Sequence, residues 1–278
     1  MILFPGCKIN LGLNVLRKRA DGYHDIETVM MPVGWTDVLE LLPSQADDVR
    51  LTTLGRRIDC VPEKNLVVKA FRAVQSVCDI PPVDIVLQKI VPDGAGLGGG
   101  SADAASTVKG LNELFALGLS DARMAEIAAT IGADCPFFIF NRPMLATGTG
   151  TELSPVDLPV IRGLSLLIVK PESTSVSTAQ AYRGITPSLP QVPVAELTKL
   201  EIDEWQGPLV NDFEKSIFPL APEVERVKVV MMRSGALYSS MSGSGSAVYG
   251  IFADESQARR AAREFSGYPL YIEPSLML

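Results

Sequence analysis

The stretch Pro92-Asp93-Gly94-Ala95-Gly96-Leu97-Gly98-Gly99-Gly100-Ser101-Ala102-Asp103-Ala104-Ala105 places five glycines within seven positions. Ahead of it, apolar and polar residues alternate over 83–88, which is typical of a half-buried strand. After it, apolar residues recur at helical spacing over 104–115. The order is therefore strand, glycine-rich loop, helix.

A loop of this kind suits a bound anion. Glycine allows close approach of the backbone to a ligand and positive φ, so successive N–H groups can converge on one negative group. A helix that starts at Ser101 adds the positive end of its dipole and its unpaired N–H groups. The stretch therefore predicts a phosphate site formed by the main chain.

Two other interpretations of the loop stay open. One is a flexible glycine hinge, although a hinge does not require a strand before it and an amphipathic helix after it. The other is a dinucleotide site, because residues 94–99 match G-x-G-x-x-G; the acidic residue expected about 20 positions on falls in a helical stretch near Asp121. A P-loop requires lysine where this chain has Ser101, so any cation on the phosphates must come from elsewhere, and Lys8 and Lys89 are the candidates.

Composition narrows the class of protein. The chain has 278 residues, 47% apolar and 21% charged, which is typical of a folded globular protein. A net charge of −7 without a basic block argues against a nucleic-acid partner. The four cysteines are scattered without a C-x-x-C pair, and no apolar run reaches the length of about 18 residues that a membrane span needs. We expect a cytoplasmic protein with free thiols and no membrane partner.

The remaining pattern predicts an α+β protein of two domains, 1–154 and 155–278. Short strands over 7–16, 27–33, 38–42 and 49–54 suggest an antiparallel sheet, with a helix over 65–77 packed on it. A further helix begins after Ser120 as N-cap and ends at Gly132, just before Asp134. The C-terminal part reads as a strand over 164–169, little periodicity over 171–193, helices over 209–218 and 222–234, a strand over 247–252, and a last helix over 258–265.

Three segments of the chain together resemble the motifs of the GHMP kinases. They are Pro5-Gly6-Cys7-Lys8-Ile9-Asn10-Leu11, the glycine-rich loop, and Met241-Ser242-Gly243-Ser244-Gly245-Ser246. Within that superfamily, three more segments are similar to the diphosphocytidyl-methylerythritol kinases: Arg19-Ala20-Asp21-Gly22-Tyr23-His24, Gly132-Ala133-Asp134-Cys135-Pro136-Phe137-Phe138 and Asn211-Asp212-Phe213-Glu214. The similarity spans nearly the whole chain and is weak over 43–62 and 183–206.

The resemblance implies a two-domain GHMP kinase fold, with an N-terminal ATP-binding domain and the active site in the cleft between the domains. Asp134 resembles the catalytic aspartate, which orients the substrate hydroxyl and accepts its proton. Lys8 resembles the lysine beside it, which keeps Asp134 ionised and offsets charge on the transferring phosphoryl group.

The resemblance also implies the binding residues. Those for ATP are Asn65 and Lys89 near the adenosine, and the loop Pro92, Asp93, Gly94, Ala95, Gly96, Leu97, Gly98, Gly99, Gly100, Ser101 and Ala102 around the phosphates. Those for the substrate are Asn10, Tyr23, His24, Asp134, Thr178 and Tyr182, with the aromatic rings stacking on cytosine. Mg²⁺ is expected from phosphoryl-transfer chemistry, with Ser101 as its candidate ligand.

The implied reaction is ATP-dependent phosphorylation of the 2-hydroxyl of 4-diphosphocytidyl-2-C-methyl-D-erythritol, a step of non-mevalonate isoprenoid biosynthesis, by a monomer or weak homodimer. Another GHMP kinase acting on mevalonate or homoserine, a non-catalytic nucleotide-binding protein, and a Rossmann oxidoreductase remain as alternatives. The chain departs from the family pattern at Cys7, where alanine is usual, and at Ala102, where a second serine is usual. Both replacements are small, and neither removes a predicted catalytic group.

Overall fold

The computed structural model describes residues 1–171 and 177–277. The chain forms two compact units, each built from separate segments of the sequence. Unit 1 contains Met1–Cys7, Pro32–Asp93 and Gly98–Arg142, and unit 2 contains Lys8–Met31, Gly94–Leu97 and Pro143–Leu278. Helices and strands occur in both, which confirms the α+β class. Each compact unit combines several separate segments, whereas the predicted domains, 1–154 and 155–278, are continuous ranges. The predicted domain ranges stay a prediction.

Unit 1 contains a four-stranded sheet in the order β1-β4-β6-β5. Its strands are β1 (Ile2–Leu3), β4 (Val38–Pro43), β5 (Arg50–Gly55) and β6 (Val83–Lys89). β4 runs antiparallel to β1 and β6, but β5 runs parallel to β6. The expectation of a purely antiparallel sheet was therefore wrong for β5, because the connection from β5 to β6 contains a helix and is long enough to return the chain in the same direction.

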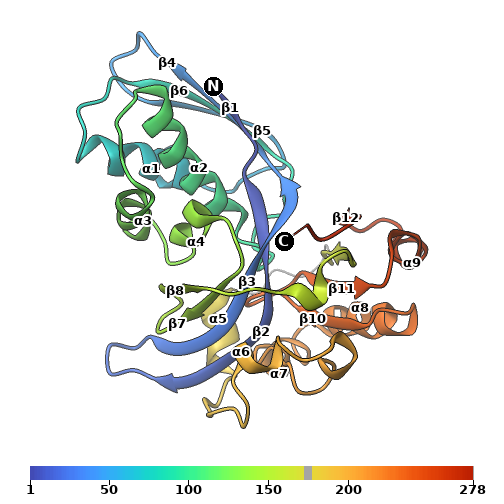
Figure 1. Ribbon diagram of the computed structural model, residues 1–278. Coiled ribbons are helices and arrows are strands. Elements are labelled where there is room, and N and C mark those ends of the chain that lie inside the picture. The colour runs from blue at the N-terminus through green and yellow to red at the C-terminus, as the bar shows by residue number, and fades with distance from the viewer. Residues whose placement is uncertain (172–176, 278) are drawn as a thin grey trace. The chain divides into compact units, whose positions relative to one another are not determined.

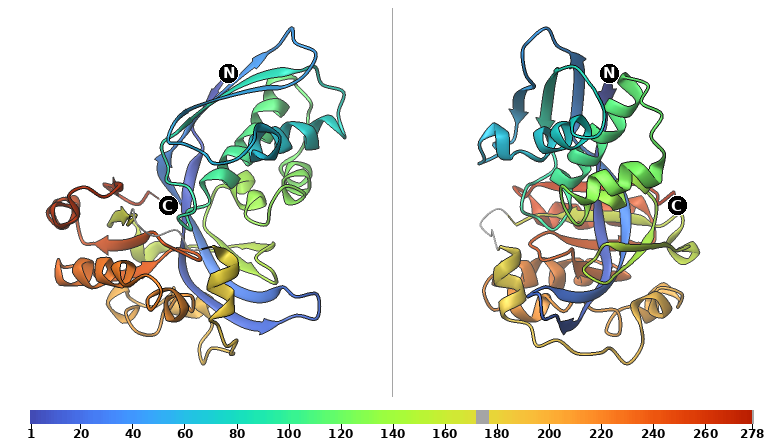
Figure 2. Two further views of the ribbon diagram at one scale, coloured as in Figure 1. Left: turned by 180° about the vertical axis from the view of Figure 1, so that it is seen from behind. Right: turned by 90° about the vertical axis from the view of Figure 1, so that its left-hand side faces the viewer.

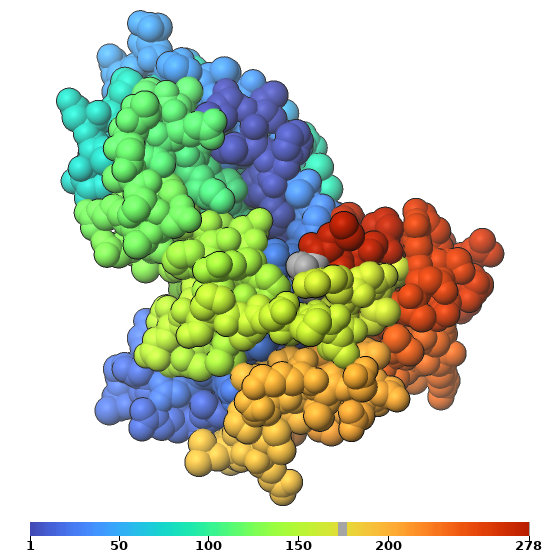
Figure 3. All heavy atoms as spheres, viewed as in Figure 1, coloured from blue at the N-terminus to red at the C-terminus, as the bar shows by residue number. Residues whose placement is uncertain are grey.

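The helices of unit 1 lie on one side of this sheet in both views of Figure 2. They are α1 (Leu66–Gln75), α2 (Gly99–Leu114), α3 (Asp121–Ala129) and α4 (Cys135–Phe140), with the 3₁₀ turn η1 (Pro62–Lys64) before α1. The predicted apolar face of α1 is confirmed, since Val67, Ala70, Phe71 and Val74 are all buried. In the space-filling view, α2 to α4 form a continuous surface, coloured green (Figure 3).

The ends of α3 show one correct prediction and one error. Ser120 is the N-cap, as expected, and its hydroxyl accepts a hydrogen bond of 3.2 Å from the Arg123 N–H. Gly132 is not the C-cap; that position is Thr130. The chain continues as a turn in which the Cys135 N–H donates to the Gly132 carbonyl, and α4 follows at once. A left-handed glycine end is therefore not needed there.

Unit 2 carries most of a sheet in the order β2-β3-β7-β8. Its strands are β2 (Gly6–Lys18), β3 (His24–Thr36), β7 (Met144–Thr147) and β8 (Glu152–Pro155). The first residues of β2 and the last of β3 belong to unit 1. The N-terminal strands thus divide between two sheets, where the sequence pattern suggested one. Periodicity identifies strands but does not say which ones pair.

A second sheet of unit 2 has the order β10-β11-β9-β12, and all its pairs are antiparallel. It contains β9 (Ser165–Val169), β10 (Tyr238–Met241), β11 (Val248–Phe252) and β12 (Leu270–Glu273), with α8 (Pro222–Arg233) after β9 and α9 (Glu255–Ala262) after β11. This order of elements is a split βαβ arrangement (Figure 1). Side chains of both helices pack on the sheet in one apolar core.

The predicted helix over 209–218 is helical only at its end, in α7 (Glu214–Ile217). Residues before it lie along β2, where the Leu13 N–H donates to the Val210 carbonyl at 2.9 Å and the Asp212 N–H donates to the Leu13 carbonyl at 2.8 Å. These bonds satisfy the backbone outside a helix. The remaining elements are short: η2 (Pro159–Ile161), α5 (Thr178–Arg183), α6 (Val194–Leu197), η3 (Ile202–Glu204) and η4 (Arg263–Phe265). None of the helices within 1–171 and 177–277 combines the length and the apolar character that a bilayer crossing requires.

The α8–sheet contact yields a paired test. Val227 is 2% exposed in this core, whereas Val229 on the same helix is 40% exposed. Val227→Ala should lower the free energy of unfolding by about 1–3 kcal/mol, through lost burial and the cavity it leaves. Val229→Ala should change it by less than about 0.5 kcal/mol. Urea denaturation followed by circular dichroism measures both; equal losses would contradict the assigned packing.

Candidate active site

Three sequence motifs meet in unit 2 through main-chain hydrogen bonds. The Lys8 N–H donates to the Leu97 carbonyl at 2.9 Å, and the Ala247 N–H donates to the Ala95 carbonyl at 3.0 Å. The turn 94–97 is therefore held on one side by β2 and on the other by the segment that follows the 241–246 loop. Because these bonds use only backbone atoms, they position the turn independently of its side chains.

Ser242 adds a side-chain link between the same segments. Its hydroxyl donates to the Gly96 carbonyl at 2.9 Å and accepts from the Asn10 N–H at 3.3 Å. Gly96 has a φ of +75°, and a Cβ there would lie 2.0 Å from the Ser242 carbonyl oxygen. Only glycine fits this position, both for its backbone conformation and for the close approach.

Lys8 and Asn10 project from the same face of β2 and are 3% and 2% exposed. The Lys8 Nζ donates to Asn10 Oδ1 at 2.5 Å, and Asn10 Nδ2 donates to Thr28 Oγ1 at 3.0 Å. The Tyr249 hydroxyl donates to the Asn10 carbonyl at 2.8 Å. The amide is therefore held in one orientation, and the ammonium is directed by it.

Asn211 anchors the 241–246 loop through side-chain hydrogen bonds. Its Nδ2 donates to the carbonyls of Met241 and Gly243, both at 2.8 Å, and its Oδ1 accepts from the Phe213 N–H at 3.0 Å. Sequence reasoning singled out the segment that contains Asn211 but assigned no role to it. The feature that could have revealed its role is that a family-like segment, Asn211-Asp212-Phe213-Glu214, falls within the helix predicted over 209–218.

The predicted aromatic residues of the substrate site come together in unit 2. The His24 and Tyr182 rings stack with centroids 4.6 Å apart, and Tyr182 meets Phe213 edge to face at 4.8 Å. His24 is the first residue of β3 and not a loop residue as expected. Burial, together with the charge of Lys18, lowers the pKa of His24, which keeps the imidazole neutral near pH 7.

Two other predicted substrate residues lie at more open positions. Tyr23 is 67% exposed. The Thr178 hydroxyl at the start of α5 lies 3.1 Å from that of Ser244 in the 241–246 loop. The structure thus links Thr178 to a glycine-rich loop of the same unit and leaves the Tyr23 ring available for contact with a ligand.

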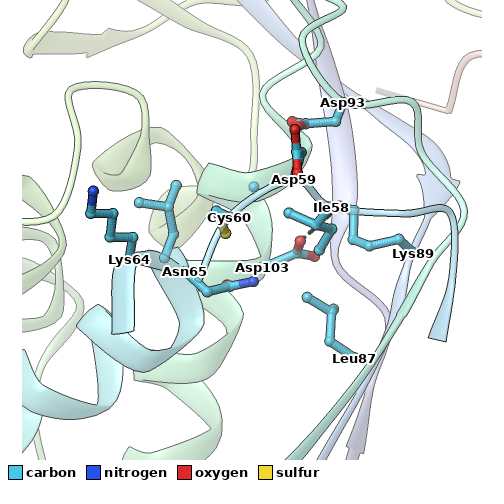
Figure 4. A pocket seen from close by; sticks show the side chains of 11 residues that line it. Ile58, Asp59, Cys60, Lys64, Asn65, Leu87, Lys89, Asp93 and Asp103 are labelled. Atoms are coloured by element: carbon cyan, nitrogen blue, oxygen red, sulfur yellow. Dashed lines mark hydrogen bonds and ion pairs between the residues drawn. The ribbon is translucent and has the colours of Figure 1, made fainter. Parts of the chain in front are cut away.

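Unit 1 contains a pocket of about 210 Å³ between the start of α1, the start of α2 and the end of β6 (Figure 4). It takes in the predicted nucleotide residues Asn65, Lys89, Asp93 and Gly100. The other lining residues are Ile58, Asp59, Cys60, Lys64, Leu66, Leu87 and Asp103. A flat, partly apolar ring with polar edges fits a pocket of this composition.

A buried ion triad forms the polar end of this pocket. The Lys89 ammonium contacts both Asp37 and Asp103, the latter at 2.8 Å, and all three side chains are buried. Asp37 also accepts from the backbone N–H groups of Ile90 and Val91, at 2.5 and 2.9 Å. The triad therefore fixes the entry into the glycine-rich loop.

The charges in the triad shift its pKa values. Burial, and repulsion from Asp37 against the attraction of Lys89, raise the pKa of Asp103 to about 7. Burial alone would lower the pKa of Lys89, but attraction to Asp103 and Asp37 outweighs it and the net shift is upward. Lys89 thus stays charged, and its charge is already neutralised by two carboxylates. As a cation for phosphates it is therefore a weak candidate.

Asp134 lies in unit 1, half-buried, immediately before α4, and its side chain does not cap that helix. The next residue, Cys135, is hydrogen-bonded to Ser101, and burial raises the pKa of its thiol to about 11. The structure therefore brings Asp134 to the neighbourhood of the Ser101 helix start. Lys8 belongs to unit 2, and its pairing with Asp134 stays a prediction.

Two family sequence patterns match the chain. "GHMP kinases N terminal domain" matches residues 65–142 and "GHMP kinases C terminal" matches residues 196–269. The first range contains Asp134 and most of the residues that line the pocket, and the second contains Asn211 and the 241–246 loop. Both parts of a GHMP kinase are therefore present.

Individual relatives narrow the family. The 4-diphosphocytidyl-2-C-methyl-D-erythritol kinase of Parabacteroides distasonis is 49% identical over 91% of this chain and 92% of its own, and that of Porphyromonas gingivalis is 47% identical over 94% and 96%. A crystal structure of a 4-(cytidine 5'-diphospho)-2C-methyl-D-erythritol kinase superposes with a TM-score of 0.83 at 32% identity over 98% of both chains. The chain belongs to the 4-diphosphocytidyl-2-C-methyl-D-erythritol kinase family. A mevalonate kinase structure, with a TM-score of 0.74 at 14% identity over 98% of both chains, shares the fold.

The raised pKa of Asp103 predicts a pH-dependent stability. The unfolded carboxyl loses its proton near pH 3.8 and the folded one at about 7, so the folded state binds more protons between these values and stability falls as pH rises through them. Asp103→Asn removes this loss. Its Tm relative to wild type should therefore be higher at about pH 8 than at about pH 5, as measured by thermal unfolding.

Asp84→Asn is the control for this measurement. The hydrogen bond from Arg50 lowers the pKa of Asp84, so its carboxylate stabilises the fold above the unfolded pKa. Both its folded and its unfolded pKa lie below pH 5, so its replacement should change Tm by about the same amount at pH 5 and at pH 8. Parallel pH curves for wild type and Asp103→Asn would contradict the assigned protonation.

Proposed function

We propose that the protein transfers the γ-phosphoryl group of ATP to the 2-hydroxyl of 4-diphosphocytidyl-2-C-methyl-D-erythritol. The observation that carries this proposal is the identity of 47–49% to kinases of that name over more than nine tenths of the chain. The geometry supports it, since a glycine turn bonded to two other motifs and a stacked aromatic pair occur in the same unit.

ATP would use the pocket of unit 1 for its base and the backbone of 92–102 for its phosphates. Asn65 and Lys89 line the pocket, and Gly99 and Gly100 form the first turn of α2, where unpaired N–H groups attract anions. Ala102 is buried and provides its N–H only to the Gly98 carbonyl. Its missing hydroxyl therefore removes a side-chain contact and leaves the backbone arrangement intact.

Mg²⁺ fits this site as an ion held mainly by the phosphates. No group of three or more His, Cys, Asp or Glu side chains suited to a metal exists among the described residues. Mg²⁺ commonly keeps several waters and takes few protein ligands beside substrate phosphates. The Ser101 hydroxyl at the start of α2 would serve as one such ligand. When bound, the ion neutralises negative charge on the transferring group.

The chemical step needs a base and a cation. Asp134 would orient the substrate hydroxyl and accept its proton, while Lys8, directed by Asn10, would offset the charge that develops on the phosphoryl oxygens. The cytosine would stack on Tyr182 and His24, with Tyr23 and Thr178 closing around the rest of the substrate. A neutral His24 has one donor and one acceptor nitrogen for the polar edge of the base.

A coupled ADP-release assay tests the proposed activity with the cytidyl substrate, mevalonate and homoserine side by side. Turnover is expected only with the cytidyl substrate. Release of ADP with mevalonate or homoserine in its place would favour another GHMP kinase, and acceptor-independent binding of nucleotide without turnover would favour a non-catalytic protein.

Asp134→Asn should fold, bind ATP as wild type does and lose kcat by roughly 10²- to 10⁴-fold, because the amide cannot accept the hydroxyl proton. Isothermal titration with ATP and the coupled assay measure the two properties separately. Asp121→Asn, on the exposed first turn of α3, is the control and should retain activity. Near-normal turnover of Asp134→Asn would exclude the assigned role. If Lys8 acts together with Asp134, Lys8→Met combined with Asp134→Asn should cost little more than the worse single change.

Tyr182→Ala should raise the KM for the cytidyl substrate by roughly 5- to 100-fold, because one stacking surface is lost. The KM for ATP should change by less than about twofold, since Tyr182 is not among the residues that line the pocket of unit 1. Tyr182→Phe keeps the ring and is the matched control. Equal KM values for Tyr182→Ala and Tyr182→Phe would remove Tyr182 from the substrate site.

A further inference from the structure

Unit 2 contains a pocket of about 300 Å³ beside β2. Its lining comes from Asn14 of β2 and from the segments 188–197 and 207–215. The residues expected to bind ATP or the cytidyl substrate lie elsewhere in the chain. The pocket is therefore a different place from the sites considered so far, and it calls for an account of its own.

Asn14 is a buried polar residue of this pocket without an internal partner. It is 6% exposed, and its side-chain amide forms no hydrogen bond with any residue of 1–171 or 177–277. It lines the pocket, so a bound group can reach it there. A buried amide that lacks partners loses hydrogen bonds that water would provide, and such a group requires an explanation.

The strand directs Asn14 away from the predicted aromatic pair of the substrate site. Successive side chains of a strand point to opposite faces of the sheet. Leu13 and Val15, on either side of Asn14, belong to the apolar core against which Tyr182 packs. The Asn14 side chain therefore lies on the other face of β2, and the pocket is separated from Tyr182 by the strand itself.

Main-chain hydrogen bonds fix the walls of the pocket next to Asn14. The Leu13 N–H donates to the Val210 carbonyl at 2.9 Å, and the Ser188 N–H donates to the Val15 carbonyl at 3.1 Å. Both lining segments are thus bonded to the immediate neighbours of Asn14. The pocket is consequently held in shape by the backbone of β2.

The charges that line the pocket neutralise each other. Among the described residues around it, the ionisable ones are Asp212 and Lys215, and they form an ion pair at 3.0 Å. The second carboxylate oxygen of Asp212 accepts from the Val15 N–H at 2.9 Å. Because both oxygens of the carboxylate are engaged, a neutral ligand fits this pocket better than an ion.

The remaining lining specifies the kind of neutral ligand. A side-chain amide such as that of Asn14 offers an acceptor and a donor on one planar group. An adjacent donor and acceptor are its complement, and the N–H and C=O of a lactam, which is a cyclic amide, lie together on one edge. The apolar side chains of Leu197, Val192 and Pro208 suit a hydrocarbon body.

We propose that this pocket binds a neutral lactam with an apolar body, held by two hydrogen bonds between the lactam edge and the Asn14 amide. Such a ligand gives both polar atoms of Asn14 a partner and covers the apolar part of the lining. Its binding requires neither ATP nor the cytidyl substrate, since the residues that hold it are not assigned to either.

The first test uses the wild-type chain with 2-quinolone and coumarin. These flat bicycles have the same shape, but coumarin carries a ring oxygen where 2-quinolone carries N–H. 2-Quinolone should bind with a Kd of about 1 mM or lower, as expected for a ligand of this size. Coumarin should bind roughly 10-fold more weakly, because one hydrogen bond is lost and its ring oxygen faces Asn14 Oδ1.

Chemical-shift titration of the ¹⁵N-labelled full-length chain measures both Kd values. The side-chain NH₂ of Asn14 and the backbone amides of Ser188 and Val210 should shift with 2-quinolone. Equal affinities of the two probes would overturn the proposal. So would the absence of saturation by either probe at about 5 mM, which is the result for a pocket that holds only water.

The second test is Asn14→Leu, which keeps the bulk of the side chain and removes the amide. The ratio of the Kd of coumarin to that of 2-quinolone should fall from roughly 10 to roughly 1. Gln191→Leu is the matched control, because Gln191 lines the same pocket but is exposed and can be hydrated. This control should keep the wild-type ratio within about twofold.

A wild-type ratio in Asn14→Leu, or an equal fall in Gln191→Leu, would overturn the contact with Asn14. Should Asn14→Leu fail to fold, the wild-type comparison of the two probes decides. Titration of the wild-type chain with 2-quinolone is then repeated with saturating ATP and, separately, with saturating cytidyl substrate. Its Kd should change by less than about twofold, and displacement by either would place the probe in the active site and overturn the separate pocket.

Discussion

The close approach of two backbones at Gly96 and Ser242 is the constraint on which the rest of unit 2 depends. No side chain fits between them, since a Cβ at Gly96 would lie 2.0 Å from a carbonyl oxygen. The turn 94–97 can therefore lie against the 241–246 loop only if residue 96 is glycine. Once it lies there, the Lys8 and Ala247 N–H groups find their acceptors on the turn, and the Ser242 hydroxyl joins it to Asn10. The predicted phosphate-binding loop gains its shape from this contact without depending on flexible side chains.

Unit 1 buries three ionisable side chains together. The triad contains two carboxyl groups and one ammonium, so it would carry an excess negative charge if all three were ionised. The raised pKa of Asp103 reduces that charge, and two backbone N–H donors stabilise the Asp37 carboxylate. A buried ion triad contributes little net stability compared with an apolar core. Its place at the junction of β6, the glycine-rich loop and α2 suggests that its value lies in positioning. It orients the loop entry and one wall of the pocket at once.

Several polar residues connect the recognised motifs without belonging to the predicted site. Asn211 supports the 241–246 loop through two carbonyls, and Tyr249 and Thr28 fix the backbone and amide of Asn10. The contacts of Asn211 help to explain why the segment over residues 211–213 departs from the helix expected there. Its backbone bonds to β2 and its asparagine bonds to the loop, so a regular helix would remove both sets of contacts.

Sequence alone determined the local features of this protein. The strand before the glycines, the amphipathic face of α1 and the Ser120 cap follow from spacing between near neighbours, and the structure has them as expected. The family followed from motifs that are each continuous in the chain, and the site residues assigned from the same motifs stay a prediction. Errors arose at Gly132, at the parallel β5 and over 209–213, where the outcome depends on which distant segment completes the backbone hydrogen bonds.

Tertiary structure alone decided which residues from distant segments form hydrogen bonds and ion pairs with one another. Lys89 and Asp37 are 52 positions apart and Asn10 and Ser242 are 232 apart, and no local pattern relates such residues. Periodicity and capping act over one helical turn or one strand pair, whereas burial, charge balance and hydrogen-bond satisfaction depend on every segment that folds around a group.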